Sequence, residues 1–125
     1  MKMITKAIAK KLVAADLAFL ESDDGTTGDE IVVKFFNPVG AATWWIVTGT
    51  PLNAGGEPDY DTDNPADWHL FGFVTLGDAR DAELGYVLLS QLEEIKGMFG
   101  LGIERDMYYN GGSLKAVMAK VKEAA

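Results

Sequence analysis

Apolar residues near the start of the chain recur every three or four positions, the spacing of one face of an α-helix. The stripe is formed by Ile4, Ile8, Leu12, Ala15 and Phe19. Thr5 stands where an N-cap residue would begin this helix. A row of lysines (Lys2, Lys6 and Lys10) occupies a neighbouring face, where it is typical of a solvated helix surface. The pattern therefore predicts an N-terminal helix.

The next segments change to the pattern of β-strands. "IVVKFFNPVGAATWWIVTG", residues 31–49, places two β-branched and aromatic runs on either side of "NPVG", whose residue order favours a type I turn. Both runs are apolar on both faces, so we expect helices to cover much of the sheet. "WHLFGFVTL" (68–76) and "LGYVLL" (84–89) predict two more strands.

The last third of the chain mixes short elements. Ser90 and Glu93 have the spacing of a capping box, and Gly97 stands where a left-handed cap would end the helix. Residues 103–109 predict a fifth strand, and Ser113 is placed to cap a final helix. The sequence thus predicts an α+β domain with a mainly antiparallel sheet of about five strands and N-terminal, short central and C-terminal helices. We expect a single domain over residues 1–125, with an acidic polar loop at about 49–67.

Charge is unevenly distributed along the 125 residues, whose formal net charge is -8. Residues 21–67 hold ten acids and one lysine, whereas both ends of the chain are basic. A protein with such an acidic segment repels nucleic acid and attracts basic protein surfaces. A net negative charge can also serve only to keep a protein in solution. The acids that would form a partner-binding surface are Asp23, Asp24, Asp29, Glu30, Asp59, Asp61, Asp63 and Asp67.

The triplet Glu104-Arg105-Asp106 is the most conspicuous charged cluster in the sequence. In a strand over 103–109, side chains alternate between faces, so the three charges cannot converge along the strand. Arg105 would lie on the more apolar face and need a carboxylate from elsewhere, for which Glu83 is our candidate. We therefore interpret the cluster as a structural ion pair of Glu83 with Arg105. The alternative is a ligand or catalytic pocket near Glu83, Arg105, Asp106 and Tyr108.

Sites for metals, cofactors and nucleophiles are poorly supported. "DYDTDNPADWHL" begins like a calcium loop, but Asn64 stands in place of the turn glycine and Leu70 in place of the bidentate glutamate. His69 is the only histidine, there is no cysteine, and no G-x-S-x-G elbow occurs. We expect no metal, no cofactor and no catalytic residue, and hence a protein that is not an enzyme. The sequence contains no apolar run of membrane-spanning length and no signal-peptide pattern, so we expect a cytoplasmic protein without a membrane partner.

Several segments together resemble a bacterial family of domains of unknown function. They are "KFFNPVGAATWWIVTG", "WHLFGFVTL", "ELGYVLLSQLEEIKG" and "GLGIERDMYY", in this order, after the opening "MKMITKAIAKKL". Thr48-Gly49 depart from the family's pattern, in which an acid often stands after the strand. Members of that family are carried on conjugative plasmids and integrative mobile elements. The resemblance implies this genomic setting and supplies no reaction or catalytic residues.

Two functional hypotheses follow. The first is a non-enzymatic interaction module of a mobile genetic element, which presents its acidic surface to a host nucleic-acid-binding or defence protein. Its partner would have a basic surface, and we do not expect it to bind nucleic acid directly. The second is a small-molecule-binding domain or unrecognised enzyme with its pocket near Glu83, Arg105 and Asp106.

Overall fold

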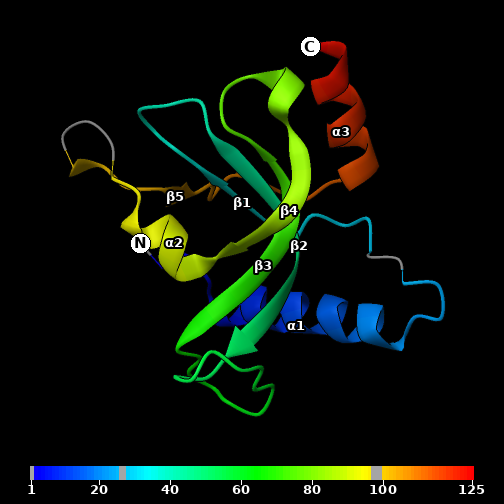
Figure 1. The fold of residues 1–125 in the computed structure, drawn as a ribbon, viewed down its shortest axis with the longest axis vertical. Helices are drawn as coiled ribbons and strands as arrows, with labels where there is room; N and C mark the ends of the chain where they lie inside the picture. Colours follow the sequence, from blue (N-terminus) through cyan, green and yellow to red (C-terminus); the bar gives the residue numbers. More distant parts are fainter. Residues whose placement is uncertain (1, 26–27, 97–99) are drawn as a thin grey trace.

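The computed structural model describes residues 2–25, 28–96 and 100–125, and its elements follow the predicted order. Three α-helices, one 3₁₀ helix and five strands are present in this part of the chain (Figure 1). They are α1 (Lys6–Glu21), β1 (Val33–Phe36), β2 (Thr43–Leu52), β3 (Asp67–Thr75), η1 (Ala79–Asp81), β4 (Glu83–Leu88), α2 (Leu89–Glu94), β5 (Glu104–Arg105) and α3 (Leu114–Glu123). The α+β class is confirmed.

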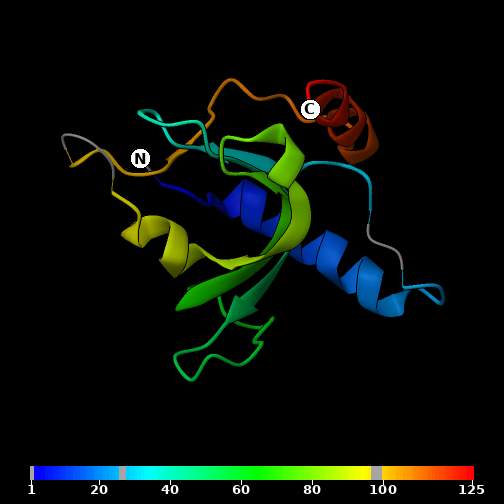
Figure 2. The same ribbon diagram turned by 45° about the horizontal axis from the view of Figure 1, so that its top comes forward.

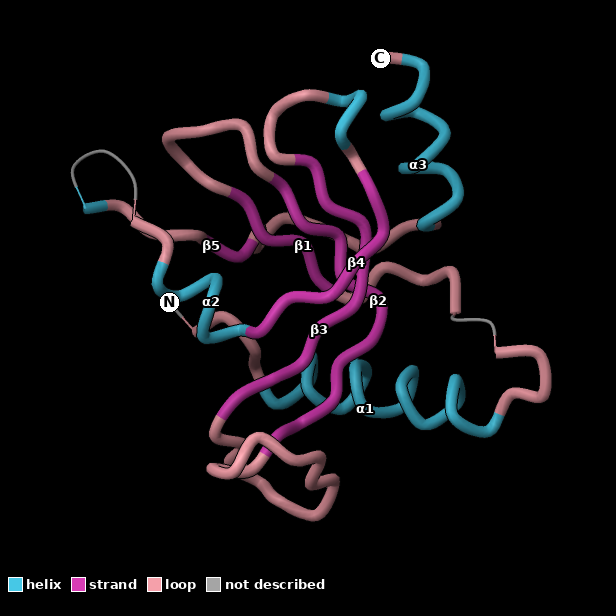
Figure 3. Tube along the Cα trace, viewed as in Figure 1, coloured by secondary structure: helices cyan, strands magenta, loops and turns pink. Residues whose placement is uncertain are grey.

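All five strands form one antiparallel sheet in the order β4-β3-β2-β1-β5 (Figure 3). The predicted first hairpin is present, since Phe36 pairs with Thr43 and the side chain of Asn37 accepts the N–H of Val39 in the turn. β2 runs further than its sequence pattern indicates, because residues 49–52 continue to pair with β3. The acidic loop therefore spans residues 53–66 rather than 49–67.

One face of the sheet is covered by α1 and α2. Leu12 and Leu92 from these helices are fully buried against strand residues such as Phe35, Ile46 and Leu70. Helix α1 approaches the sheet closely at Gly49 of β2, where an added Cβ would lie 3.2 Å from the Cβ of Leu12. A glycine on β2 thus allows α1 to pack directly on the strand.

The other face is covered at one end by α3, which stands at the upper right in Figure 1 and remains apart from α1 in Figure 2. Leu114 of α3 packs with Val47 and Phe73 in a second core cluster. Val47 is the extra residue of a β-bulge, because the register of β2 with β3 shifts between Ile46 and Thr48. The two-sided apolar strands predicted that helices would cover much of the sheet, and helices do pack on both of its faces.

The predicted helix caps are partly correct. The side chain of Thr5 accepts the N–H of Ile8, and that of Ser113 accepts the N–H of Ala116. Ser90 is not an N-cap, because α2 already begins at Leu89. The predicted end of this helix at Gly97 lies outside the described residues.

The predicted fifth strand is shorter than residues 103–109. Only Glu104 and Arg105 pair with β1, opposite Phe36 and Phe35. The backbone N–H of Asp106 still donates to the carbonyl of Lys34, and the chain then turns away, with Tyr109 N–H bonded to the carbonyl of Asp106. The alternation that we assumed for residues 103–109 therefore applies to two residues only.

None of the helices formed by the described residues combines the length and the hydropathy that are needed to cross a bilayer.

Candidate functional site

A cavity with a volume of about 590 Å³ opens on the sheet face that α3 covers only at its other end. Thr50 of β2 pairs with His69 of β3, which pairs with Leu88 of β4, so all three side chains project from the same face. The last turns of α1 and the loop of residues 53–66 form the walls. The lining residues are Asp16, Phe19, Leu20, Thr48, Thr50, Leu52, Gly56, Pro58, Tyr60, His69, Tyr86 and Leu88.

Asp16 is the acidic residue of this cavity and was not predicted as a site residue. It lies in α1 with only 7% of its surface exposed, although a buried carboxylate is costly without partners. Thr50 donates a hydrogen bond of 2.9 Å to its Oδ2, and Tyr60 donates one of 2.5 Å to the same oxygen. The carboxylate thus ties the helix to β2 and to the acidic loop.

Oδ1 of Asp16 remains available as an acceptor. Both hydrogen bonds that Asp16 accepts within the described part of the chain end on Oδ2. Among the same residues, no fully buried side-chain oxygen lacks a partner. Oδ1 must therefore have some surface exposed to solvent, and Asp16 is one of the residues that line the cavity.

Tyr60 is fixed as a hydrogen-bond donor. Burial, followed by the hydrogen bond to Asp16, raises the pKa of the Tyr60 hydroxyl from 10.0 to about 12. The phenol therefore keeps its proton throughout the physiological pH range and continues to donate to Asp16. This contact anchors the middle of the acidic loop to α1.

An aromatic stack forms part of the cavity wall. The rings of His69 and Tyr86 lie parallel, with centroids 4.5 Å apart and an interplanar angle of 10°. Phe71 packs on the same Tyr86 ring at 4.8 Å. His69 is thus packed against Tyr86 and also lines the cavity.

Two of the eight acids predicted as a partner-binding surface have internal structural roles. Asp67 accepts the N–H of Trp68 and the N–H of Ser90 at Oδ1, and the hydroxyl of Ser90 at Oδ2. Burial acts to raise the pKa of Asp67, but these hydrogen bonds outweigh it, so that the pKa lies below its usual value. Asp67 therefore holds the first turn of α2 against the start of β3.

Asp29 has a similar role at α3. It accepts the hydroxyl of Ser113 and the N–H of Lys115, and these hydrogen bonds lower the pKa of its carboxyl. Glu30 forms an isolated β-bridge with Ser113. Asp23, Asp24 and Glu30 are exposed, near the two ends of the segment that joins α1 to β1.

The remaining acids lie in the loop of residues 53–66. Asp61 and Asp63 are exposed, and Asp59 is half-buried and accepts the N–H of Asp61 in a local turn. No three Asp, Glu or His side chains converge closely enough to hold a metal ion within residues 2–25, 28–96 and 100–125. The role of these acids as a partner-binding surface stays a prediction.

The predicted Glu83–Arg105 ion pair is wrong. Glu83 begins β4 and Arg105 ends β5, which are the two opposite edges of the sheet. The Nε–H of Arg105 instead donates to the backbone carbonyl of Lys2, over 3.0 Å. Arg105 thus fastens the N-terminal segment to the sheet edge, and no pocket unites it with Glu83.

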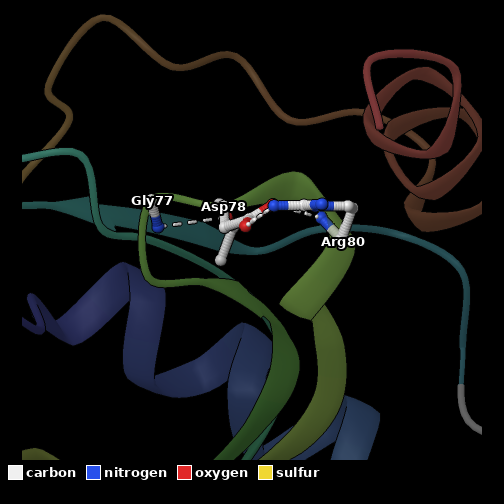
Figure 4. Close-up of polar contacts among 4 residues, drawn as sticks. Gly77, Asp78 and Arg80 are labelled. Atoms are coloured by element: carbon white, nitrogen blue, oxygen red, sulfur yellow. Dashed lines mark hydrogen bonds and ion pairs between the residues drawn. The ribbon is translucent and has the colours of Figure 1, made fainter.

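Asp106 and Tyr108 do not complete the predicted pocket either. Asp106 forms an ion pair with Lys34 at 3.6 Å and lines a hollow of about 300 Å³ that includes neither Arg105 nor Glu83. Tyr108 is 93% exposed. A second ion pair joins Asp78 to Arg80 at 2.8 Å in the β3–β4 connection (Figure 4). The Asp78–Arg80 pair is local and exposed, whereas the Lys34–Asp106 pair is half-buried and joins β1 to the segment after β5.

The sequence did contain a signal for Asp16. Counting in steps of four from Ile8 reaches Leu12 and then Asp16, which places an acid on the apolar face of the helix. A charged residue on that face requires a partner or a function. Tyr60 gave a weaker signal, as the one aromatic residue in a polar loop.

The chain belongs to a family described as "Protein of unknown function (DUF2958)", whose model matches residues 3–125. No curated protein and no solved structure matches the chain.

Proposed function

We propose that this member of the family is a non-enzymatic interaction module, which binds a partner with a basic surface through the acidic loop of residues 53–66 and the acids between α1 and β1. The observation that carries the proposal is the charge of these two segments. Residues 53–66 contain Glu57, Asp59, Asp61 and Asp63 and no lysine or arginine, and residues 21–33 contain five acids and likewise no base. Such segments attract cationic surfaces.

The structure refines the set of acids that would contact the partner. Asp67 and Asp29 use their carboxylates to hold helix ends, so they are assigned to the fold rather than to the contact. Asp23, Glu30, Asp61 and Asp63 are exposed and remain available at the surface. The contact would therefore centre on the exposed acids of the two segments.

The partner class follows from this chemistry and from the resemblance to proteins of mobile elements. A protein of a plasmid or integrative element encounters host nucleic-acid-binding and defence proteins, whose grooves are lined with lysine and arginine. Carboxylates on the acidic segments would occupy such a groove in place of phosphates. The domain would then compete with DNA for its partner.

The test is affinity capture of host proteins on the immobilised full chain at low salt, followed by a salt gradient. We expect DNA-binding proteins to be retained, to elute at moderate salt, and to lose DNA when the domain is added. The variant Asp59→Asn/Asp61→Asn/Asp63→Asn should retain much less of them. The matched control, Glu93→Gln/Glu94→Gln/Glu123→Gln, removes the same charge from α2 and α3 and should bind like the unchanged chain.

Retention that does not respond to salt, or that the loop variant and the control variant weaken equally, would contradict the proposal. An empty column would do so as well.

A further inference from the structure

We propose that the cavity at Asp16 is a binding site for an organic cation, namely an ammonium or guanidinium group attached to an apolar stem. The site is distinct from the acidic surface of the proposed function, since its lining comes from α1 and three strands as well as from the loop. Its volume of about 590 Å³ falls within the range of about 300–1,000 Å³ typical of small-molecule sites.

The charge of the cavity requires a cationic rather than an anionic ligand. Asp16 is the acid in the lining, and no lysine or arginine is among the lining residues. The segments that supply the walls, residues 12–21 of α1 and the loop of residues 53–66, also contain no lysine or arginine. An anion would therefore meet a carboxylate and an acidic rim without any compensating positive charge.

The hydrogen-bonding state of Asp16 gives the cation a defined contact. Thr50 and Tyr60 orient the carboxylate through Oδ2 and leave Oδ1 as an accessible acceptor. A carboxylate that is 7% exposed and held by two hydroxyl groups is pre-organised for a charge-assisted hydrogen bond. A neutral ligand would gain much less from this contact.

The remaining lining suits the apolar part of such a ligand. Phe19, Leu52 and Leu88 provide aliphatic and aromatic surface. The stacked rings of His69 and Tyr86 add polarisable faces, which attract ammonium and guanidinium groups. An acid at one point of a mostly apolar cavity is the arrangement that an amphipathic cation needs.

Two sources can present this chemistry: a free small molecule, or a lysine or arginine side chain of a partner. Only the second source rests on the proposed function, because it requires a basic partner at the acidic segments. The experiments below therefore probe the cavity with small molecules and use a readout that is independent of partner capture.

The first measurement is a titration of the ¹⁵N-labelled full chain with benzamidine, and with benzamide as its nearly isosteric neutral control. We expect benzamidine to shift the amide signals of Thr50, Tyr60 and His69, and benzamide to bind roughly tenfold or more weakly. Equal binding of both, or shifts confined to residues outside the cavity, would overturn the proposal.

Variants test the contacts. Asp16→Asn retains a carbonyl oxygen for Thr50 and Tyr60 but loses the charge, so benzamidine affinity should fall about tenfold or more. Tyr86→Ala removes a ring that is 63% exposed, so the fold should survive, and affinity should fall by a few-fold. Glu123→Gln removes the same charge as Asp16→Asn from the exposed end of α3, outside the cavity, and should leave affinity within about twofold.

The two sources are distinguished with agmatine and N-acetyl-arginine N-methylamide. Tighter binding of agmatine would assign the site to a free cation, and tighter binding of the arginine derivative would assign it to a partner's side chain. If Asp16→Asn leaves benzamidine affinity unchanged although Thr50 and Tyr60 keep their native shifts, the cavity does not bind cations through Asp16 and the proposal fails. The outcome of the benzamidine titration does not depend on partner capture. The proposed function can therefore fail in the capture experiment while the cation site stands.

Discussion

Asp16 and Asp67 are two aspartates that join a helix to the sheet, and they differ in how many of their oxygens are used. Asp67 accepts three hydrogen bonds that are distributed over both carboxylate oxygens, and their donors are Trp68 and Ser90. Asp16 accepts two hydrogen bonds, both on Oδ2, and lines a cavity. Both oxygens of the Asp67 carboxylate are engaged by the protein, whereas Asp16 has one oxygen that accepts no hydrogen bond from the described residues.

This difference separates structural carboxylates from binding ones in this fold. A carboxylate whose two oxygens both accept internal hydrogen bonds contributes to stability, and a ligand gains less from it. A carboxylate that is oriented by two donors, with one accessible oxygen, can accept a further hydrogen bond without rearrangement. We therefore expect substitutions of Asp67 to lower stability and substitutions of Asp16 to weaken ligand binding.

The largest stability effect is expected for Asp67→Ala. It removes the acceptors of Trp68 N–H, Ser90 N–H and the Ser90 hydroxyl, and it should lower the free energy of unfolding by about 2 kcal/mol. Urea denaturation followed by circular dichroism measures the loss. Asp63→Ala, an exposed loop acid, is the control and should change stability by about 0.5 kcal/mol or less. Equal losses would mean that Asp67 does not anchor α2.

Replacing each aspartate by asparagine separates the effect of the acceptor oxygens from the effect of the charge. Asparagine keeps one acceptor oxygen, which is sufficient for Thr50 and Tyr60 at position 16. At position 67 the new NH₂ group would face an N–H or O–H donor. We expect Asp67→Asn to cost about 1–2 kcal/mol of unfolding free energy and Asp16→Asn about 0.5 kcal/mol. The opposite order would show that the Asp16 charge, rather than its acceptor geometry, stabilises the fold.

A smaller effect is expected on the titration of Tyr60. Its pKa of about 12 has burial as the larger cause and the Asp16 hydrogen bond as the next. Asp16→Asn should therefore lower the pKa of Tyr60 while leaving it above 10.0, which ¹³Cζ-tyrosine NMR can measure. Because the folded pKa is raised, the contribution of Tyr60 to stability is complete below pH 10 and is lost as the pH rises through 12. An unchanged Tyr60 titration in Asp16→Asn would contradict the contact.

The architecture could be predicted because its signals are local. The apolar stripe through Leu12, the "NPVG" turn and the caps at Thr5 and Ser113 each depend on residues that lie close together in the sequence. The extension of β2 to Leu52 was missed because Thr50-Pro51 follow a glycine and look like the start of a loop. Pairing with β3 outweighed that local preference.

The cavity could not be predicted in the same way, because its parts are distant in sequence. Asp16 meets Thr50 at a separation of 34 residues and Tyr60 at a separation of 44. Only the sheet order and the length of β2 bring them together, and neither is encoded in a local motif. Glu104-Arg105-Asp106, by contrast, are adjacent in sequence and attract attention, yet they form no common site: Arg105 donates to the Lys2 carbonyl and Asp106 pairs with Lys34.

Substitutions of Arg105 are expected to have a small effect on stability. Had Arg105 paired with a buried Glu83, Arg105→Ala would cost about 3 kcal/mol or more by leaving that carboxylate unpaired, and Arg105→Met much less. Because Arg105 donates only to the Lys2 carbonyl within the described residues, both variants lose the same hydrogen bond. We expect both to lower the free energy of unfolding by about 0.5–1 kcal/mol in urea denaturation. A loss of about 3 kcal/mol for alanine alone would restore the ion-pair interpretation and make the β5 edge a candidate site.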